Sequence, residues 1–392
     1  MGICGLLPAL VCALLAQDVQ MTREGDHWRR VDSGSAGGPQ TRILKVATRG
    51  RVIVRGSDGD QITYRLVERV KARSSEQAHR LFGSSIATTS TINSVTTLSI
   101  FPKANEAVTT QLEITAPRRL ATVIVQAQPG GVEAYDLDGD VTASTAAGPI
   151  RCDGIRGAFD ASTGGGEIHL GKVGGRIRCV NGAGSISIDS AGGAADCQSA
   201  GGEIQVRDAA GPLVLSTEGG NIQVDRAGSS VEAHTAEGVI EIAQANGMVF
   251  ADTRGGAIQI GSARGVRCQS ATGAVHVRTS SGPLQIQTAL GSILAEVLAG
   301  ARLQNSSLVA GSGDITVLLP SNVALSVMAR NDSGANPRIV SEFSELRARS
   351  IAIARPAVVY QGPNVYQGSI HGGGPLLTLE TASGIIYVKK SR

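Results

Sequence analysis

The strongest constraint on this chain is a short phrase, Gly-x-Φ-x-Φ with Φ apolar, which recurs between Gly139 and Gly300. The central glycines are 18 residues apart over the first seven copies, and two further copies continue the pattern. They are Gly148, Gly166, Gly184, Gly202, Gly220, Gly238, Gly256, Gly273 and Gly291. A repeat of this size is too small to bury its own apolar face and does so only against its neighbours. The period therefore predicts a solenoid with one repeat per rung.

Aligning the repeats on the central glycine separates inward from outward positions. The residue two after the glycine is Ile or Val in every copy, and further apolar columns lie four after it and five and seven before it. Side chains along a strand alternate between its two faces. Each repeat therefore contributes two strands to one shared interior, and we predict an all-β, single-stranded β-solenoid (β-helix) with 18-residue rungs.

The corners of the rungs carry a second pattern. The residue three before the glycine has a hydroxyl or amide side chain in every copy, and its parity matches the inward columns. The column comprises Thr145, Thr163, Asn181, Ser199, Thr217, Thr235, Thr253, Ser270 and Thr288. We predict that it forms a hydrogen-bonded ladder between rungs. We attribute the corner glycines to sharp bends that need a positive φ.

The rest of the chain divides around this array. Residues 1–16 form an apolar run of signal-peptide length, and residues 17–41, rich in Ser and Gly, are expected to be a linker. Residues 42–130 alternate as strands do and contain one expected short helix, from Ser74 or Ser75 to Phe82, so we assign them to a β-rich N-terminal cap. The period fails after Gly291. Residues 131–320 are assigned to the regular solenoid and 321–392 to an irregular C-terminal β region.

Composition narrows the class of function. The net charge is only +3, aromatic residues make up 3%, and no Lys/Arg run has interleaved aromatics, so we expect no nucleic-acid partner. After residue 16 no apolar run reaches the roughly 20 residues of a membrane helix. We expect a mature chain without a membrane span, exported to the periplasm, the cell surface or the extracellular space.

The cysteines and histidines give little sign of a chemical centre. Cys179 and Cys197 occupy one inward column on adjacent rungs, so they are either a disulfide or two small buried apolar side chains. His169, His234 and His276 fall in different rungs without the spacing of a metal site. The aspartates of calcium-binding β-rolls are missing as well. We expect no metal and no cofactor.

Several segments together resemble a known family. They are the strand pair from Arg42 to Arg55, the segment from Glu76 to Phe82, the Gly-x-Ile-x-Val rungs, and the ending Gly372 to Ile386. Over residues 43–388 the chain resembles bacterial adhesin-like domains of unknown function, which are similar to head-domain β-solenoids. The resemblance implies a bacterial envelope or secreted protein with a right-handed single-stranded solenoid. It carries no catalytic residues.

The outward positions leave two classes of function open. Three residues after each glycine stands a row that we take as the candidate binding face: Arg151, His169, Ser187, Gln205, Gln223, Glu241, Gln259 and His276. It could contact a glycan or a surface protein, or only keep the rod soluble. A β-helix hydrolase or lyase acting on an envelope polysaccharide is the alternative, but it needs clustered carboxylates, and the outward Asp160, Asp196 and Asp252 are spread along the rod. We predict a non-enzymatic adhesin-like or scaffold module.

Overall fold

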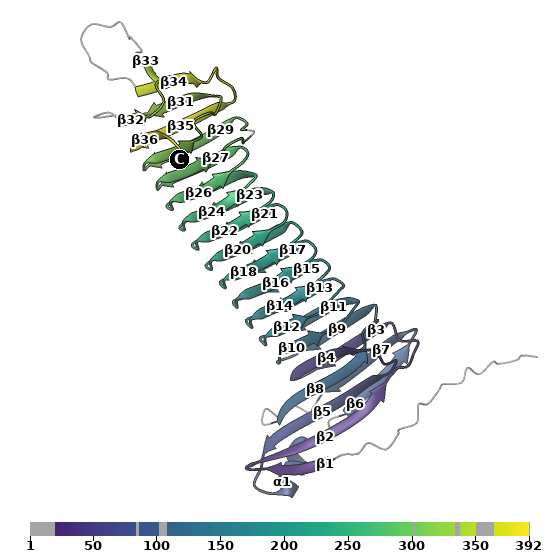
Figure 1. The fold of residues 1–392 in the computed structure, drawn as a ribbon. Helices are drawn as coiled ribbons and strands as arrows, with labels where there is room; N and C mark the ends of the chain where they lie inside the picture. The colour runs from purple at the N-terminus through teal and green to yellow at the C-terminus, as the bar shows by residue number, and fades with distance from the viewer. Residues whose placement is uncertain are drawn as a thin grey trace, which may run out of the picture.

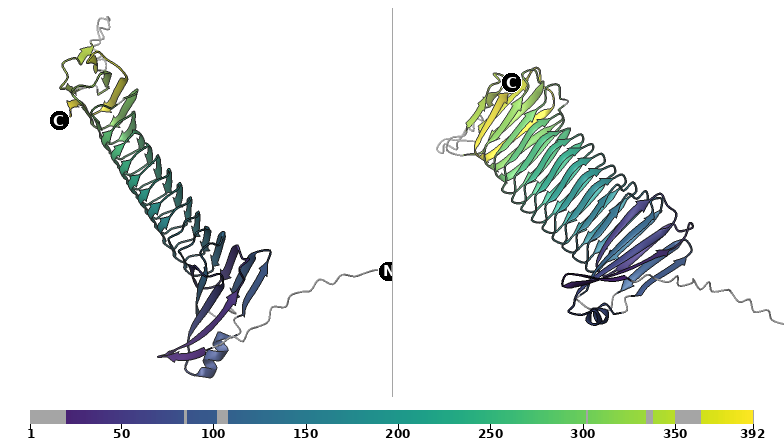
Figure 2. Two further views of the ribbon diagram at one scale, coloured as in Figure 1. Left: turned by 45° about the vertical axis from the view of Figure 1, so that its right-hand side comes forward. Right: turned by 60° about the horizontal axis from the view of Figure 1, so that its bottom comes forward.

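The chain forms an elongated all-β rod, shown in Figures 1 and 2. The computed structural model describes residues 20–83, 86–101, 108–301, 303–333, 338–349 and 364–391. The strands form two facing sheets, called A and B, and between residues 108 and 341 successive short strands alternate between these sheets and climb along the rod. The predicted β-solenoid is confirmed. The predicted signal peptide, residues 1–16, lies outside the described residues.

Sheet A runs from the N-terminal to the C-terminal end of the rod. In spatial order its strands are β1 (Gln20–Glu24), β2 (His27–Ala36), β5 (Ile62–Lys71), β8 (Val108–Pro117), β4 (Arg51–Ser57), β10 (Val132–Tyr135), β12 (Ile150–Asp153), β14 (Ile168–Val173), β16 (Ile186–Ala191), β18 (Ile204–Ala209), β20 (Ile222–Ala227), β22 (Ile240–Ala245), β24 (Ile258–Ala263), β26 (Val275–Ser280), β28 (Ile293–Val297), β30 (Ile315–Leu319), β36 (Ile385–Lys390) and β32 (Arg338–Ser341). The first three pairings are antiparallel and the remainder are parallel.

Sheet B packs against sheet A over the same length. Its strands are β6 (Ile86–Ile92), β7 (Val95–Phe101), β3 (Ile43–Thr48), β9 (Thr122–Ala127), β11 (Asp140–Thr145), β13 (Phe159–Thr163), β15 (Ile177–Asn181), β17 (Ala195–Ser199), β19 (Leu213–Thr217), β21 (Val231–Thr235), β23 (Met248–Thr253), β25 (Gly265–Ser270), β27 (Leu284–Leu290), β29 (Ser306–Ser312), β35 (Leu376–Ser383), β31 (Leu325–Asn331), β34 (Asn364–Ile370) and β33 (Arg347–Arg349). The pairings from β7 to β31 are parallel.

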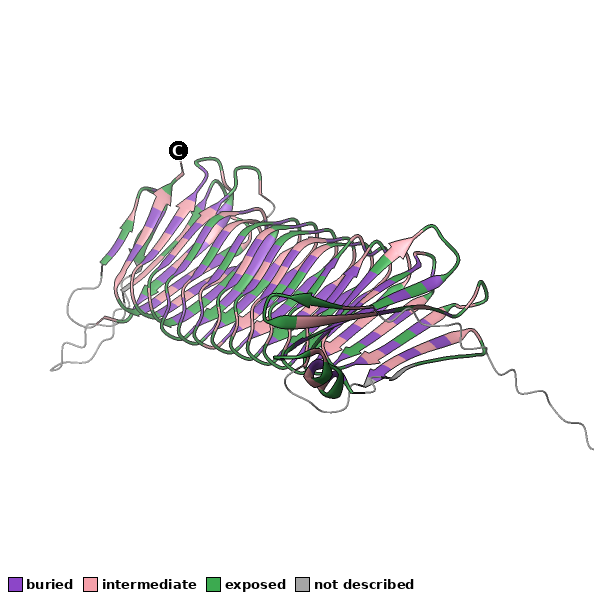
Figure 3. Ribbon diagram, turned by 90° about the horizontal axis from the view of Figure 1, so that it is seen from below, coloured by how far each residue is buried: buried purple, intermediate pink, exposed green. Residues whose placement is uncertain are grey.

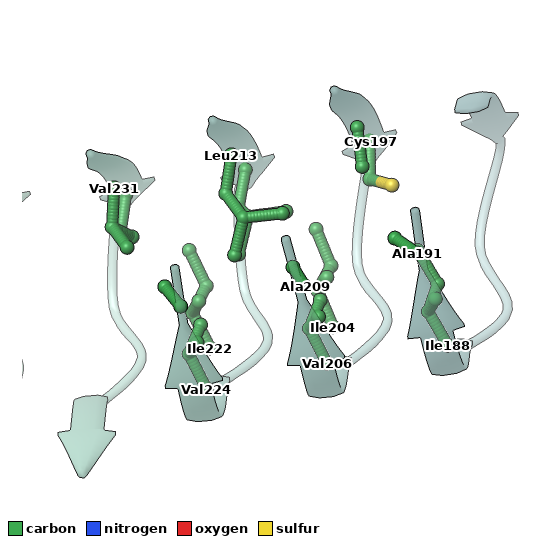
Figure 4. Close-up of a cluster of buried hydrophobic side chains, with 14 of the residues drawn as sticks. Ile188, Ala191, Cys197, Ile204, Val206, Ala209, Leu213, Ile222, Val224 and Val231 are labelled. Atoms are coloured by element: carbon green, nitrogen blue, oxygen red, sulfur yellow. The ribbon is translucent and has the colours of Figure 1, made fainter. Parts of the chain in front are cut away.

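The core is a stack of identical columns between the two sheets. In sheet A, Ile186 pairs with Ile204 and Ile204 with Ile222, so the same side chain recurs one rung above itself. All three are fully buried, and Figure 4 shows Ile204 and Ile222 directed into the interior with Leu213 of sheet B. Burying one such side chain contributes about 1.5–3 kcal/mol. Figure 3 shows the resulting alternation of buried and exposed positions along the strands.

The predicted ladder of hydroxyl and amide side chains is also confirmed. Thr163 Oγ1 donates to the carbonyl oxygen of Gly148 on the preceding rung (3.0 Å) and accepts from the backbone N–H of Gly166 (3.2 Å). Asn181 makes the equivalent pair of bonds with its amide. From Thr145 to Ser270 each corner thereby satisfies a backbone carbonyl and an N–H that the parallel ladder leaves over, and Thr288 satisfies the carbonyl alone.

The reason predicted for the repeat glycines was wrong. None of the nine has a positive φ. Each approaches the glycine of the preceding rung closely instead: a Cβ added at Gly202 would overlap the carbonyl oxygen of Gly184, and one at Gly220 would overlap that of Gly202. Glycine is required because the backbone of one rung lies where a side chain would be.

The N-terminal segment differs from the linker expected over residues 17–41. β1 and β2 lie there, and β2 pairs with β5 along ten residues. The strand lacks an apolar alternation because charged side chains pair across it: Arg30 Nε donates to Glu68 Oε2 (2.7 Å). Trp28 Nε1 also donates to the carbonyl oxygen of Ala72 (3.1 Å). Cross-strand partners of this kind cannot be recognised from the period of one strand.

The expected helix is present as α1 (Ser75–Phe82). Ser74 caps it, its Oγ accepting from the N–H of Gln77 (3.2 Å), and Gly83 ends it with a φ of 55°. Its buried face packs Phe82 against Val70 of β5. Among the described residues, no helix has the length and apolar character needed to cross a membrane.

Candidate binding faces

The predicted row occupies one column on the outer face of sheet A. Its eight residues lie on successive parallel strands from β12 to β26, and each is the register partner of the next, as with Gln205 and Gln223 or Gln259 and His276. All eight side chains are exposed or half-buried. The structure therefore brings together the whole predicted set, as a straight line of side chains about 4.8 Å apart.

A second outward column beside this row includes the charged residues Asp189, Arg207 and Asp225. Asp189 lies between Arg207 and His169, with its Oδ1 3.3 Å from Arg207 Nη1 and its Oδ2 3.8 Å from His169 Nε2. Gln223 Nε2 donates to Asp225 Oδ1 (3.3 Å). These exposed pairs contribute little to stability. They fix side-chain positions on a flat surface of mixed charge.

The row begins at a more ordered cluster near the cap. Glu133 on β10 is buried and accepts from Arg51 Nε (2.9 Å) and from the Tyr135 hydroxyl (3.1 Å). Burial, followed by the neighbouring Glu133 carboxylate, raises the pKa of Tyr135. The guanidinium of Arg55 lies 5.6 Å from the Tyr135 ring centroid. This cluster gives the N-terminal end of the row a rigid boundary.

The outward aspartates are on the opposite sheet and are not gathered. Asp160, Asp196 and Asp252 lie on β13, β17 and β23 of sheet B. β15 separates the first two strands, and β19 and β21 stand between the last two. Glycosidic hydrolysis by paired carboxylates needs them about 5–9.5 Å apart on one site. Asp160 and Asp196 lie two strands apart, about 9.6 Å, with Arg178 between them, and Asp252 lies three strands beyond Asp196, about 14 Å along the rod.

The buried cysteines are free thiols. Cys179 and Cys197 are register partners in sheet B and are fully buried. A hydrogen bond with Cys197, followed by burial, raises the pKa of Cys179. Burial likewise raises the pKa of Cys152 and Cys268. Because the thiolate is the reactive form, these side chains act as small apolar core residues. The described residues hold no group of His, Cys, Asp and Glu arranged to bind a metal ion.

The sequence interpretation missed a groove on the outer face of sheet B. It has a volume of about 360 Å³ and lies across β25, β27, β29 and β35, near the C-terminal end of the rod in Figure 1. Its outward residues are mostly amides and hydroxyls. One signal was available: the interval between the phrases at Gly291 and Gly313 is 22 residues, not 18.

Two solved structures that resemble this chain have low identity to it. No family model matches the chain, and no curated protein matches it. A solved structure described as a putative cell adhesion protein from Clostridium sporogenes is 9% identical, with 93% of this chain and 99% of that chain covered and a TM-score of 0.19. Another, a putative adhesin from Bacteroides fragilis, is 11% identical over 93% and 97% of the two chains, with a TM-score of 0.24. We build the function from the geometry of this chain itself.

Proposed function

We propose that the chain is an exported, adhesin-like module that binds an extended ligand, a glycan or a surface protein, through the outer face of sheet A and catalyses no reaction. One observation carries the proposal: eight polar residues, from Arg151 to His276, stand in a single in-register column on eight successive strands. Such a column repeats hydrogen-bonding groups at a fixed interval, which suits a ligand that is itself extended.

The side chains of the row support binding rather than catalysis. The row offers amides, imidazoles, a hydroxyl and both signs of charge, without a paired set of carboxylates. Mixed polar surfaces give specificity through the arrangement of hydrogen bonds and charges. The rod holds these groups on a rigid sheet, and sites carried on strands are positioned more accurately than sites on loops.

The test is to add charge to the row and measure binding to cells or extracellular matrix. We expect the triple variant Gln205→Lys, Gln223→Lys, Gln259→Lys to lose binding while its thermal unfolding stays unchanged, since all three side chains point outward. The matched control is Ser162→Lys, Gln198→Lys, Ser216→Lys, which adds the same charge to the outer face of sheet B. Unchanged binding in the first variant, or an equal loss in both, would contradict the proposal.

The catalytic alternative has a separate test. Incubating the chain with a panel of envelope polysaccharides and measuring released reducing ends detects either a hydrolase or a lyase. We expect no release above a boiled control. Release that persists in the Gln-to-Lys variant would place an enzymatic site elsewhere on the rod.

A further inference from the structure

We propose that the groove on sheet B is a binding site for one or two residues of an uncharged saccharide. The site lies on the sheet opposite the candidate row and does not depend on the function proposed above. Its recognition groups are the amides of Gln269, Gln285, Gln287 and Asn305 and the hydroxyl of Ser307, beside the apolar side chain of Leu376.

The groove exists because the repeat is interrupted. Gln269 pairs with Gln287, 18 residues on, but Gln287 pairs with Val309, which is 22 residues on. The four extra residues fall between β28 and β29. At the entry of β29 the N–H of Leu284 bonds to Ser306 Oγ, whereas the equivalent N–H of Val266 bonds to the carbonyl oxygen of Pro283, and the outer surface is hollowed at that point.

Fixed contacts hold the wall of the groove. Asn305 Oδ1 accepts from the backbone N–H of Leu376 (2.9 Å), which joins the start of β29 to the start of β35. Ser306 Oγ accepts from the N–H of Leu284 (3.1 Å) and donates to the carbonyl oxygen of Gln304 (2.9 Å). The wall is therefore preorganised, which lowers the entropy lost on binding.

The amides in the groove are available to a ligand. Within the described part of the chain, no hydrogen bond engages the side chains of Gln269, Gln285 and Gln287, and all three are exposed. Two glutamines elsewhere on the faces are held by neighbouring carboxylates, Gln198 by Asp196 (3.5 Å) and Gln223 by Asp225 (3.3 Å). What distinguishes the groove is that three unengaged amides lie together on two adjacent strands. No carboxylate lines the groove. Each free amide offers both a donor and an acceptor.

This lining favours a sugar over other ligand classes. β25, β27, β29 and β35 are interior strands whose backbone groups are already paired, so a peptide cannot add as another strand. No aromatic ring is present to stack a nucleobase. A pyranose presents hydroxyl groups at its edge and C–H groups on its face, which match the amides and the exposed side chain of Leu376.

The charged residues and the volume of the groove bear on which saccharides it can hold. Arg267 is the single charged side chain in the lining. Glu380 lies on β35 itself, outside the lining, and is the register partner of Val309 in the groove and of Arg330 on β31. The volume of about 360 Å³ is at the lower end of the range of ligand pockets, about 300–1,000 Å³. One or two sugar residues fit this space, as an internal or terminal part of a longer chain.

Saturation-transfer NMR and titration with defined disaccharides test the proposal. The probes are cellobiose, lactose and N,N′-diacetylchitobiose, with digalacturonate as the acidic arm. We expect at least one neutral disaccharide to bind and the double variant Gln285→Ala, Gln287→Ala to bind it about tenfold more weakly, since two hydrogen bonds are removed. Preferred binding of digalacturonate that is lost in Arg267→Ala would overturn the assignment to uncharged sugars.

The matched control is Gln198→Ala, Gln244→Ala, which removes two outward amides, one from each sheet, that belong neither to the groove nor to the row on sheet A. We expect it to bind the disaccharide as the unaltered chain does, and both variants to unfold at the same temperature as that chain. Absence of binding to all four probes would overturn the proposal, as would an equal loss in the control variant.

Discussion

The regular rungs and the N-terminal cap bury polar groups in different ways. In the rungs, the column of corner side chains from Thr145 to Ser270 repeats one pattern, donating to the preceding rung and accepting from its own corner. In the cap, formed by β1, β2, β5, β8 and α1, polar burial is particular to each site: Arg30 pairs with Glu68 and lies 5.0 Å from the Phe82 ring. Asp32 is buried with an Oδ1 that has no hydrogen-bond partner among the described residues.

The difference shows where stability is distributed. In a stack of like rungs, the free energy of unfolding is close to a sum of rung and nearest-neighbour terms. A destabilising substitution in one rung therefore also weakens the contacts with the two rungs next to it. The cap closes the end of the stack with long antiparallel strands. A destabilising substitution in the cap therefore acts through the one side-chain contact that it removes.

The largest expected effect comes from the repeat glycines. In Gly202→Ala the new Cβ would overlap the carbonyl oxygen of Gly184, and the two rungs cannot separate without breaking their parallel hydrogen bonds. We expect the free energy of unfolding to fall by about 3 kcal/mol or more, as for severe overpacking. Urea unfolding followed by circular dichroism measures it.

The adjacent glycine supplies the control. A Cβ at Gly201 would meet no atom within 4 Å, so Gly201→Ala should change the free energy of unfolding by no more than about 0.5 kcal/mol. Equal effects of the two substitutions would show that close approach between rungs is not what requires glycine.

A smaller effect is expected from the corner ladder. Thr217 Oγ1 donates to the carbonyl oxygen of Gly202 (2.9 Å) and accepts from the N–H of Gly220 (3.3 Å). Thr217→Val keeps the shape but leaves both backbone groups without this partner, so we expect a loss of about 2 kcal/mol in the free energy of unfolding. Thr217→Ser should restore most of it, because Ser199 makes the same two bonds one rung earlier. A serine variant as unstable as the valine variant would contradict the ladder's role.

The two regions also differ in how far the sequence predicts them. The rungs were predictable because each inward position is repeated, so the alignment separates the buried Ile186, Ile204 and Ile222 from the outward Ser187 and its neighbours. The helix α1 was predictable from its cap, Ser74. β2 was not, because its stabilising partners, such as Glu68 for Arg30, are distant in sequence.

The two candidate sites also differ in how far the sequence predicts them. The row on sheet A was predicted as a set, since the period itself places Gln205 and Gln223 in one column. The groove on sheet B was missed. Its residues come from β25, β27, β29 and β35, and the last of these, with Thr378, reaches the groove only after a long excursion of the chain. An 18-residue alignment cannot place a strand that returns out of order.

The smallest effect is expected from replacing Asp32, the buried carboxylate of the cap whose Oδ1 has no hydrogen-bond partner among the described residues. Burial, followed by the charge of Glu68, raises the pKa of Asp32, against the lowering influence of Arg30. A carboxyl whose pKa is higher in the folded state favours folding while it is protonated, and that contribution is lost as the pH rises from its unfolded pKa of about 3.9 through its folded pKa.

Asp32→Asn should therefore raise the melting temperature slightly at neutral pH, and the gain should disappear in acid, where the carboxyl of the unaltered chain is protonated. Melting curves of both chains between about pH 3 and pH 7 measure this. Asp160→Asn, on the exposed face of β13, is the matched control and should show no such crossover. A loss of stability in Asp32→Asn at neutral pH would mean that the Asp32 carboxylate is a stabilising partner of Arg30. The cap would then satisfy its buried charges as fully as the rungs satisfy their hydroxyls.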